Sequence, residues 1–148
     1  MPKTVFIGTQ PSSYEDQGNP LPIRPNSTAK RIIQMMGILD DGFADNFVRM
    51  TVSPFHDPEG FSPEYWAENA RNMLPLLEGR RVVLLGTQVA QTFGYERTDY
   101  DFAAWFDHAE LHILFAVIPH PGGVNRLYNN PEMHRMVSSF LSACWELR

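Results

Sequence analysis

The sequence predicts an α/β protein whose mostly parallel sheet is covered by helices on both faces. Four short apolar runs alternate with stretches of helical periodicity, and such alternation is typical of parallel strands joined by helical crossovers. Each run ends at or near a glycine or a proline, as strands that lead into turns do. The length of 148 residues fits one domain, which we expect to span residues 1–148.

The first apolar run, Thr4–Ile7, predicts a buried strand, and it ends in the turn Gly8-Thr9-Gln10-Pro11-Ser12. Residues 13–26 follow as a polar, proline-rich stretch that is too long for a simple connector. Because long loops without regular structure are often functional, we expect residues 13–26 to form a binding loop.

A helix and the second strand come next. Ser27 or Thr28 can cap the helix, and Gly37 is its natural end, because glycine readily adopts the left-handed conformation that closes helices. The second strand is Phe47–Val52, which ends before a serine and a proline. The apolar stripe of the helix consists of Ile32, Ile33 and Met36.

The middle of the chain repeats this pattern. Ser62 is the expected cap of a helix with Pro63 at its first position, where proline costs no hydrogen bond. Pro75 should end or kink that helix. Arg81–Leu85 predicts the third strand, and Gln88–Phe93 opens a short helix that the next glycine ends.

The last part of the chain contains the fourth strand and a long helix. Residues 95–110 are aromatic and acidic without a clear period, and we assign no element there. The fourth strand is the apolar run that begins at Ile113 and stops at His120. Asn130 caps the final helix, with Pro131 at its first position. Residues at helical spacing form its core stripe: Met133, Met136, Val137, Phe140, Leu141, Cys144 and Trp145.

Composition excludes several classes of protein. The formal charge of −5 argues against a protein that coats nucleic acid by bulk electrostatics. A local basic patch stays open, because Arg24, Lys30 and Arg31 lie close together, either as solvated charges or as phosphate contacts. The single cysteine excludes an intrachain disulfide and a cysteine-based metal cluster, and we expect neither a metal nor an organic cofactor.

No apolar run approaches the length of a bilayer-spanning helix, and the amino terminus has no signal-peptide layout. We therefore expect a soluble, cytoplasmic protein without a membrane partner. The sequence leaves the oligomeric state open.

The strand ends predict where a binding site lies. Right-handed crossovers place the carboxyl ends of parallel strands along one edge of the sheet, and open α/β sheets bind ligands there. Four segments that are far apart in the sequence should therefore converge: GTQPS at 8–12, VSPFH at 52–56, LGTQ at 85–88 and PHPGGVNR at 119–126.

Four segments, IGTQPS, FVRMTVSPF, EYWAENARNMLPLLEGRRVVLLGTQVAQTFG and FAVIPHPGGVNR, resemble the uracil-DNA glycosylase superfamily in order, spacing and strand context. That superfamily has a motif of the GQDPY, GEAPG or GINPG kind after its first strand and one of the HPS or NPS kind after its last. The stretch PHPGGVNRLYNNP is also similar to small, often phage-encoded, glycosylase-like proteins. The resemblance covers most of the chain and implies a three-layer α/β/α sandwich around a four-stranded parallel sheet.

The resemblance also implies a reaction, cleavage of the bond between sugar C1′ and a pyrimidine nitrogen, as in base excision during DNA repair. The departing base becomes an anion, which a preorganised hydrogen-bond donor stabilises. His120 stands in the place of the HPS histidine and is the implied catalytic donor. The turn Pro121-Gly122-Gly123 would let backbone approach a phosphate, and Asn125 or Arg126 would contact phosphate or base.

The second implied catalytic residue is Gln10, at the place where active relatives carry an aspartate, asparagine or glutamate that orients water. Its amide oxygen can position a water molecule but cannot accept a proton as a carboxylate does. Thr51, Val52 and Ser53 occupy the neighbourhood of the asparagine that reads uracil in relatives, and the base that the resemblance implies is uracil or a modified pyrimidine. Phe55 or Tyr14 would stack on a flipped base. The implied substrate-binding residues are Gly8, Thr9, Pro11, Ser12, Thr51, Ser53, Phe55, Pro121, Gly122, Asn125 and Arg126.

Three functions stay open at this point. The first is an N-glycosidase that excises a pyrimidine from DNA. The second cleaves the same bond in a free or modified nucleotide, which suits the acidic composition. The third is a non-catalytic protein that binds nucleotides or bases on the same fold and lacks the water-activating carboxylate. Likeness of fold does not separate them.

Overall fold

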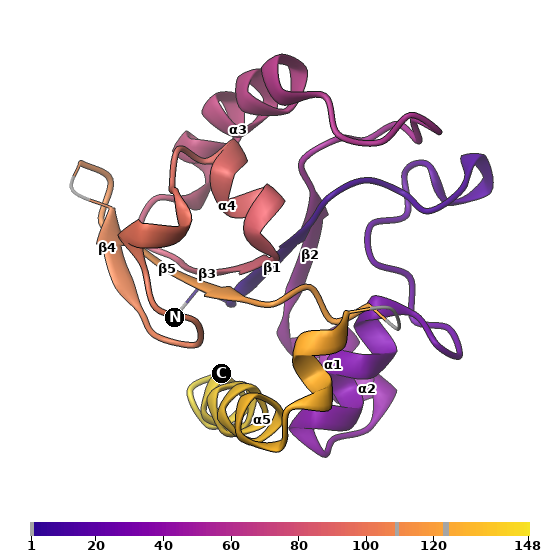
Figure 1. Cartoon of the computed structure of the whole chain (residues 1–148), viewed down its shortest axis with the longest axis vertical. Coiled ribbons are helices and arrows are strands. Elements are labelled where there is room, and N and C mark those ends of the chain that lie inside the picture. The colour runs from indigo at the N-terminus through magenta and orange to yellow at the C-terminus, as the bar shows by residue number, and fades with distance from the viewer. Residues whose placement is uncertain (1, 109, 123–124) are drawn as a thin grey trace.

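The computed structural model describes residues 2–108, 110–122 and 125–148, and its centre is a five-stranded sheet in the order β2-β1-β3-β5-β4 (Figure 1). Four strands are parallel: β1 (Val5–Gly8), β2 (Val48–Thr51), β3 (Arg81–Leu85) and β5 (Ile113–Ile118). The fifth strand, β4 (Phe106–His108), pairs antiparallel with β5. The predicted α/β class with a mostly parallel sheet is confirmed.

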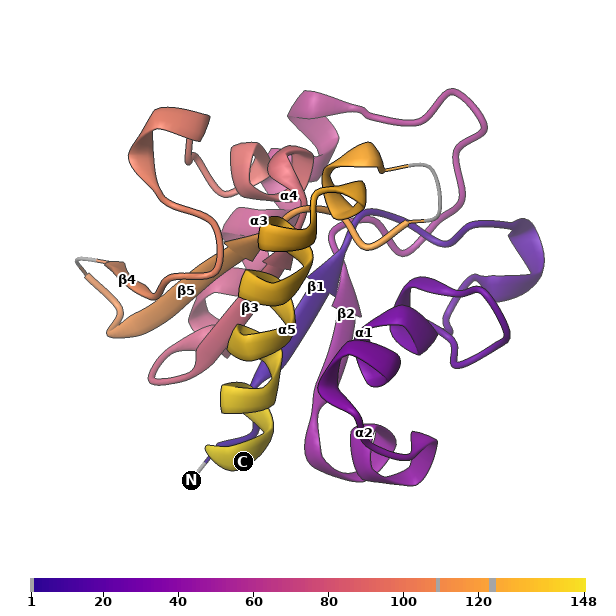
Figure 2. The ribbon, with the colours of Figure 1, turned by 60° about the horizontal axis from the view of Figure 1, so that its bottom comes forward.

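Helices cover both faces of this sheet (Figures 1 and 2). On one face lie α1 (Thr28–Met36), α2 (Asp40–Asn46) and α5 (Pro131–Glu146), and on the other lie α3 (Pro63–Leu77) and α4 (Thr87–Thr92). Short 3-10 turns occur in the connections: η1 (Tyr14–Asp16), η2 (Arg97–Asp99) and η3 (Arg126–Asn129). In the ranges that the structure describes, no helix combines the length and the apolar character needed to cross a membrane.

The central strands β1, β3 and β5 are largely buried on both faces, which explains why their sequences are continuous apolar runs rather than alternating ones. In β1, Phe6 packs with the residues of α1, α2 and α5, while Val5 and Ile7 pack with those of α3 and α4. The Phe6 ring meets the rings of Phe43 and Phe47 at centroid distances of 5.4 and 5.3 Å. The molecule therefore has two hydrophobic cores, one on each side of the sheet.

Most of the predicted helix ends are confirmed. The hydroxyl of Ser27 accepts a backbone N–H of the first turn of α1 at 3.1 Å, and Gly37 closes that helix with φ of +72°. Asn130 accepts two backbone N–H groups at the start of α5. Ser62 occupies the cap position of α3, but its side chain makes no capping hydrogen bond.

The structure departs from the sequence-based expectation in three elements. The sheet has five strands rather than four, because the stretch 95–110 contains β4, whose three residues are too few to show a period. The short helix α2 was not expected either, since Phe43 is its one buried residue. Finally, α3 runs two residues past Pro75 to Leu77, because burial of Leu77 (1% exposed) holds the last turn although proline lacks the N–H for a helical bond.

The topology places a switch point between the neighbouring strands β1 and β3. The chain leaves β1 for α1 on one face of the sheet and leaves β3 for α4 on the opposite face. At such a point the two connections run in opposite directions, and open α/β sheets bind their ligands beside it.

Candidate functional site

The segments after the four parallel strands meet at the carboxyl edge of the sheet (Figure 2). The loops after β1 and β2 stay paired, because the N–H of Ser53 donates to the carbonyl of Thr9 at 3.0 Å. The ends of β3 and β5 meet in the same way, since the N–H of Gly86 donates to the carbonyl of Ile118 at 2.8 Å. The convergence expected from the sequence is confirmed for these backbone segments.

His120 follows β5 and lies half-buried between two glycines. A methyl group on Gly86 would lie 3.1 Å from Cβ of His120, and one on Gly122 would lie 2.8 Å from its Nδ1. Gly86 also has φ of +105°, a conformation that other residues rarely adopt. Burial lowers the pKa of His120, because desolvation disfavours the imidazolium. Its ring nitrogens make no hydrogen bond to the residues that the structure describes, so they are available to a ligand.

The segment after His120 is braced by side chains that bond to its own backbone. Asn125 donates from Nδ2 to the carbonyl of His120 at 2.9 Å and accepts a backbone N–H two residues on at 3.1 Å. The hydroxyl of Tyr128 donates to the carbonyl of Pro119, and burial raises the pKa of that hydroxyl. Asn125 thus shapes the turn whether or not it also contacts a ligand. Gly123, part of the predicted phosphate turn, lies outside the described residues.

Gln10 is bonded to the loop after β2. Its Nε2 donates to the carbonyl of Asp57 at 2.7 Å, and its Oε1 accepts the N–H of Asp57 at 3.1 Å. This pair engages both ends of the amide that was expected to orient water. Because β3 separates β1 from β5, the loops of Gln10 and His120 begin two strand spacings apart, about 10 Å. The two side chains therefore share an edge, with Gln10 bonded toward β2 and His120 beside β3.

The predicted residues after β2 serve the backbone of the turn. Thr51 donates its hydroxyl to the carbonyl of Ser53 at 2.8 Å, and the buried hydroxyl of Ser53 donates to the carbonyl of Phe55 at 3.0 Å. The two candidates for stacking on a base are exposed, Phe55 by 59% and Tyr14 by 64%. The ring of Tyr14 packs edge-on against His56 at a centroid distance of 4.8 Å.

The predicted binding loop at 13–26 is organised around a buried carboxylate. Asp16, which is 2% exposed, pairs with Arg24 at 2.5 Å and accepts the hydroxyl of Ser12 at 3.3 Å. The loop also packs against the end of β1, because a methyl group on Gly8 would lie 2.8 Å from Cδ2 of Leu21. The other predicted residues differ in exposure: Thr9 is half-buried, Pro11 and Pro121 are buried, and Ser12 and Arg126 are exposed.

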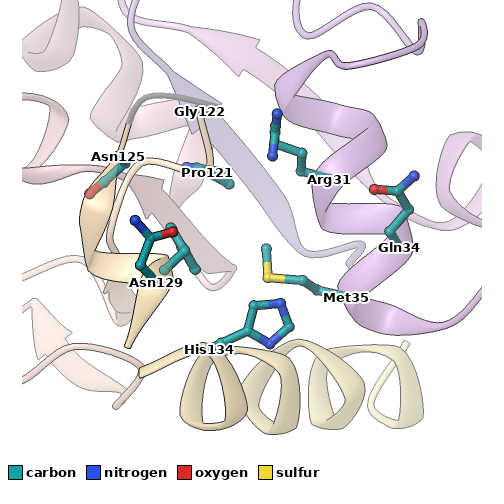
Figure 3. A pocket seen from close by; sticks show the side chains of 9 residues that line it. Arg31, Gln34, Met35, Pro121, Gly122, Asn125, Asn129 and His134 are labelled. Carbon is teal, nitrogen blue, oxygen red and sulfur yellow. The ribbon is translucent and has the colours of Figure 1, made fainter. Parts of the chain in front are cut away.

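A cavity of about 210 Å³ lies beside residues 121, 122 and 125, between α1 and the start of α5 (Figure 3). These three residues were predicted to bind substrate, but Gln10, His120 and Phe55 do not line the cavity, so it does not join the two motifs within the described part of the chain. The lining consists of Arg31, Gln34, Met35, Pro121, Gly122, Asn125, Tyr128, Asn129 and His134.

From the sequence, Arg31 was named only as part of an open basic patch, and neither Gln34 nor Met35 was placed in the site. Arg31, Gln34 and Met35 stand three and four positions apart, and such spacing puts side chains on one face of a helix. That spacing was the signal that could have shown a polar face of the helix turned toward a site. The opposite face of α1 is its apolar stripe, whose residues are buried: Ala29, Ile32, Ile33 and Met36.

The sequence matches no protein-family model, and no curated protein matches it either. Within residues 2–108, 110–122 and 125–148, no group of three or more histidine, cysteine, aspartate or glutamate side chains is arranged to hold a metal ion.

Proposed function

We propose that the protein is a uracil-DNA glycosylase-like N-glycosidase that excises uracil or a modified pyrimidine from DNA. The two motif segments, GTQPS at 8–12 and PHPGGVNR at 119–126, follow the parallel strands β1 and β5 at one edge of the sheet, which supports the proposal. Helices on both faces of the sheet are consistent with the three-layer α/β/α sandwich that the resemblance implies.

The environment of His120 is the observation that carries the proposal. Cleavage of the bond to the sugar leaves negative charge on the pyrimidine, and a preorganised N–H donor stabilises this charge. Because burial lowers the pKa of His120, the imidazole is neutral near pH 7 and donates from one nitrogen. Gly122 packs against the ring of His120, and Gly86 packs against its Cβ and backbone, so both glycines leave room for His120 where a side chain would crowd it. A neutral donor that is partly shielded from water suits the stabilisation of a departing base.

The water-orienting half of the reaction requires a change at Gln10. Its amide must exchange Asp57 for a water molecule when substrate binds, because both ends of the amide are bonded to that backbone. The exposed rings of Phe55 and Tyr14 are suited to hold a base that has left the stack.

The same two bonds at Gln10 favour a second candidate, a non-catalytic protein that binds nucleotides or bases. An amide that keeps its bonds to Asp57 orients no water. Such a protein would hold a base beside His120 and leave its bond to the sugar intact.

Release of free base distinguishes the two candidates. The substrates are uracil-containing and modified-pyrimidine oligonucleotides, single- and double-stranded, and deoxynucleotides. We expect His120→Ala to lower the rate of release by about 10²–10³-fold, the usual effect of removing one preorganised donor. His112→Asn is the matched control at the other end of β5, and it should release base as the wild type does; asparagine tolerates the φ of +53° found there.

Each outcome has a clear meaning. Release from deoxynucleotides alone would move the reaction from DNA to free nucleotides. Binding of nucleotides without any release would support the second candidate. Release that His120→Ala leaves unchanged would contradict the role of His120, and a protein that neither binds nor releases would overturn both candidates.

A further inference from the structure

Three basic residues gather before and within α1, and their environments differ. Arg24 pairs with Asp16 at 2.5 Å, and Lys30 pairs with Asp40 at 2.7 Å. Arg31 makes no ion pair or hydrogen bond with the described residues, and its Nε is buried without a partner among them. One cation of this group is thus left without a counter-charge.

Arg31 reaches from α1 into the cavity of about 210 Å³, with its guanidinium toward the 121–122 turn (Figure 3). The chain has 17 acidic residues and a formal charge of −5, yet none of the residues that line this cavity is acidic. Because a partly buried charge without a partner costs free energy, the cavity favours a ligand that supplies negative charge.

The rest of the lining suits a phosphate ester better than a simple carboxylate. The side-chain amides of Gln34 and Asn129 and the imidazole of His134 can each offer an N–H group to a ligand beside the guanidinium, and a phosphate has more acceptor oxygens to satisfy them than a carboxylate has. The weak contact of His134 Nδ1 with the hydroxyl of Ser138, at 3.4 Å, leaves Nε2 for a ligand. The apolar part of the lining, Met35, Tyr128 and Pro121, suits the organic part of such an ester.

We propose that this cavity is a phosphate-binding site in which Arg31 holds a phosphate ester of a nucleotide or of DNA. The choice of a nucleotide rests on the proposed function, whereas the preference for an anion rests on Arg31 and its surroundings. Gly122 lines the cavity and also packs against the ring of His120. A phosphate in the cavity and a base beside His120 would therefore contact the same turn.

Calorimetric titration with deoxyuridine 5′-monophosphate and with deoxyuridine measures what the phosphate contributes. We expect the monophosphate to bind about 10–100-fold more tightly, the range of charge-assisted hydrogen bonds. Arg31→Gln should remove most of this difference and leave the affinity for deoxyuridine unchanged. Arg31→Lys keeps the positive charge but lacks the planar guanidinium, so it should retain part of the difference in affinity between the monophosphate and the nucleoside.

Arg71→Gln is the matched control, because it makes the same change of charge at an exposed position of α3 on the opposite face of the sheet. It should bind all these ligands as the wild type does. Inorganic phosphate, whose binding is followed by its ³¹P resonance, tests the anion site alone. The affinity for phosphate should fall in Arg31→Gln and stay unchanged in Arg71→Gln.

A single-stranded oligonucleotide distinguishes the two sources of phosphate. If the cavity holds a DNA phosphate, Arg31→Gln weakens binding of the oligonucleotide and lowers the slope of log affinity against log salt by about one, while the monophosphate shows no advantage over the nucleoside. If it holds the phosphate of a free nucleotide, the advantage of the monophosphate is present and depends on Arg31.

Unchanged binding of inorganic phosphate, monophosphate and oligonucleotide in folded Arg31→Gln would overturn the proposal. Urea unfolding checks the fold, and Arg31→Lys replaces the glutamine variant if that variant does not fold. None of these measurements needs turnover. If no base is released while phosphate binding depends on Arg31, only the proposed function fails. If base is released and phosphate binding is the same without Arg31, only the assignment of the cavity fails.

Discussion

Gly86 and Gly122 lie against His120 on two sides, and a side chain at either glycine would collide with it. Asn125 adds a hydrogen bond to the carbonyl of His120. Neither glycine carries a functional group, yet Gly86 makes room for Cβ and the backbone of His120, and Gly122 makes room for its ring. At the scale of residues, the candidate donor is therefore positioned by neighbours from two different strand ends, with Gly86 following β3 and Gly122 following β5.

Gly86→Ala tests this contact. We expect it to lower the free energy of unfolding by about 2–4 kcal/mol, because alanine is strained at φ of +105° and its Cβ would crowd His120. Gly94→Ala is the matched control: it has φ of +92° with open space around it, and should cost about 1–2 kcal/mol from backbone strain alone. Urea unfolding measures both, and equal losses would contradict the importance of the contact.

The pKa of His120 also predicts a pH dependence of stability. The folded pKa is lowered by burial, so the unfolded chain, with a pKa of about 6.5, takes up its proton first as the pH falls. The contribution of neutral His120 is complete above about pH 6.5 and is lost as the pH falls from there toward the folded pKa. Between about pH 7.5 and pH 5, the free energy of unfolding measured with urea should fall more for the wild type than for His120→Gln. Equal losses would argue against a buried, neutral imidazole.

At the scale of elements, α3 shows how packing outweighs a local signal. Pro63 stands at its first position, where proline fits, but Pro75 lies inside the helix near its end. The helix still continues to Leu77, which is buried in the same core cluster as Trp66. The apolar contacts of the last turn thus offset the hydrogen bond that proline cannot donate.

Pro75→Ala should stabilise the protein by about 1–2 kcal/mol. Alanine restores the N–H that a helix donates, and this gain exceeds the extra freedom of the unfolded chain at an exposed position. Pro63→Ala is the matched control and should change the free energy of unfolding by less than about 0.5 kcal/mol, because the first N–H of a helix has no intrahelical partner. A destabilised Pro75→Ala protein would mean that the proline ring itself packs in the native state.

Elements that are marked by capping residues or apolar periodicity within their own sequence were predicted. Elements whose conformation depends on a partner distant in the sequence were not. The caps Ser27, Gly37 and Asn130 belong to the first kind. The strand β4 belongs to the second, because Phe106 and its neighbour Tyr95 pack on Phe115 of β5, at centroid distances of 6.1 and 5.5 Å. Three residues have no period of their own, and the partner strand decides their conformation.

At the scale of the whole molecule, the strand order brings the two motif segments to one edge. β1 and β5 both pair with β3 and run parallel to it, so the loops that follow them lie at the carboxyl ends of the strands. Open α/β sheets bind their ligands at this edge. The α1/α5 side carries the cavity with Arg31 (Figure 3), and Gly122 in its lining packs against the ring of His120. A candidate base site and a candidate phosphate site therefore lie on two sides of a single turn.

Cys144 reports on the integrity of this fold. It is the one cysteine of the chain, it lies on the buried face of α5 with 1% of its surface exposed, and burial raises the pKa of its thiol to about 12. We expect a thiol reagent at neutral pH to label the native protein at least about 10³-fold more slowly than the unfolded one. Leu141→Ala, in the same core, should speed native labelling, whereas Leu76→Ala, at a side chain 68% exposed on α3, should not. Rapid labelling of the native wild type would contradict the packing of α5.

The sequence by itself determined the α/β class, the four parallel strands, most helix ends and the segments that meet at the carboxyl edge. These features follow from apolar runs and capping residues that act within a few positions of the chain. Only the tertiary structure decided that Gln10 bonds to Asp57, 47 residues away, and that Arg31 enters a cavity without an acid. The reason is physical: a side chain's partner depends on which loops the strand order brings together, and local propensity carries no information about that order.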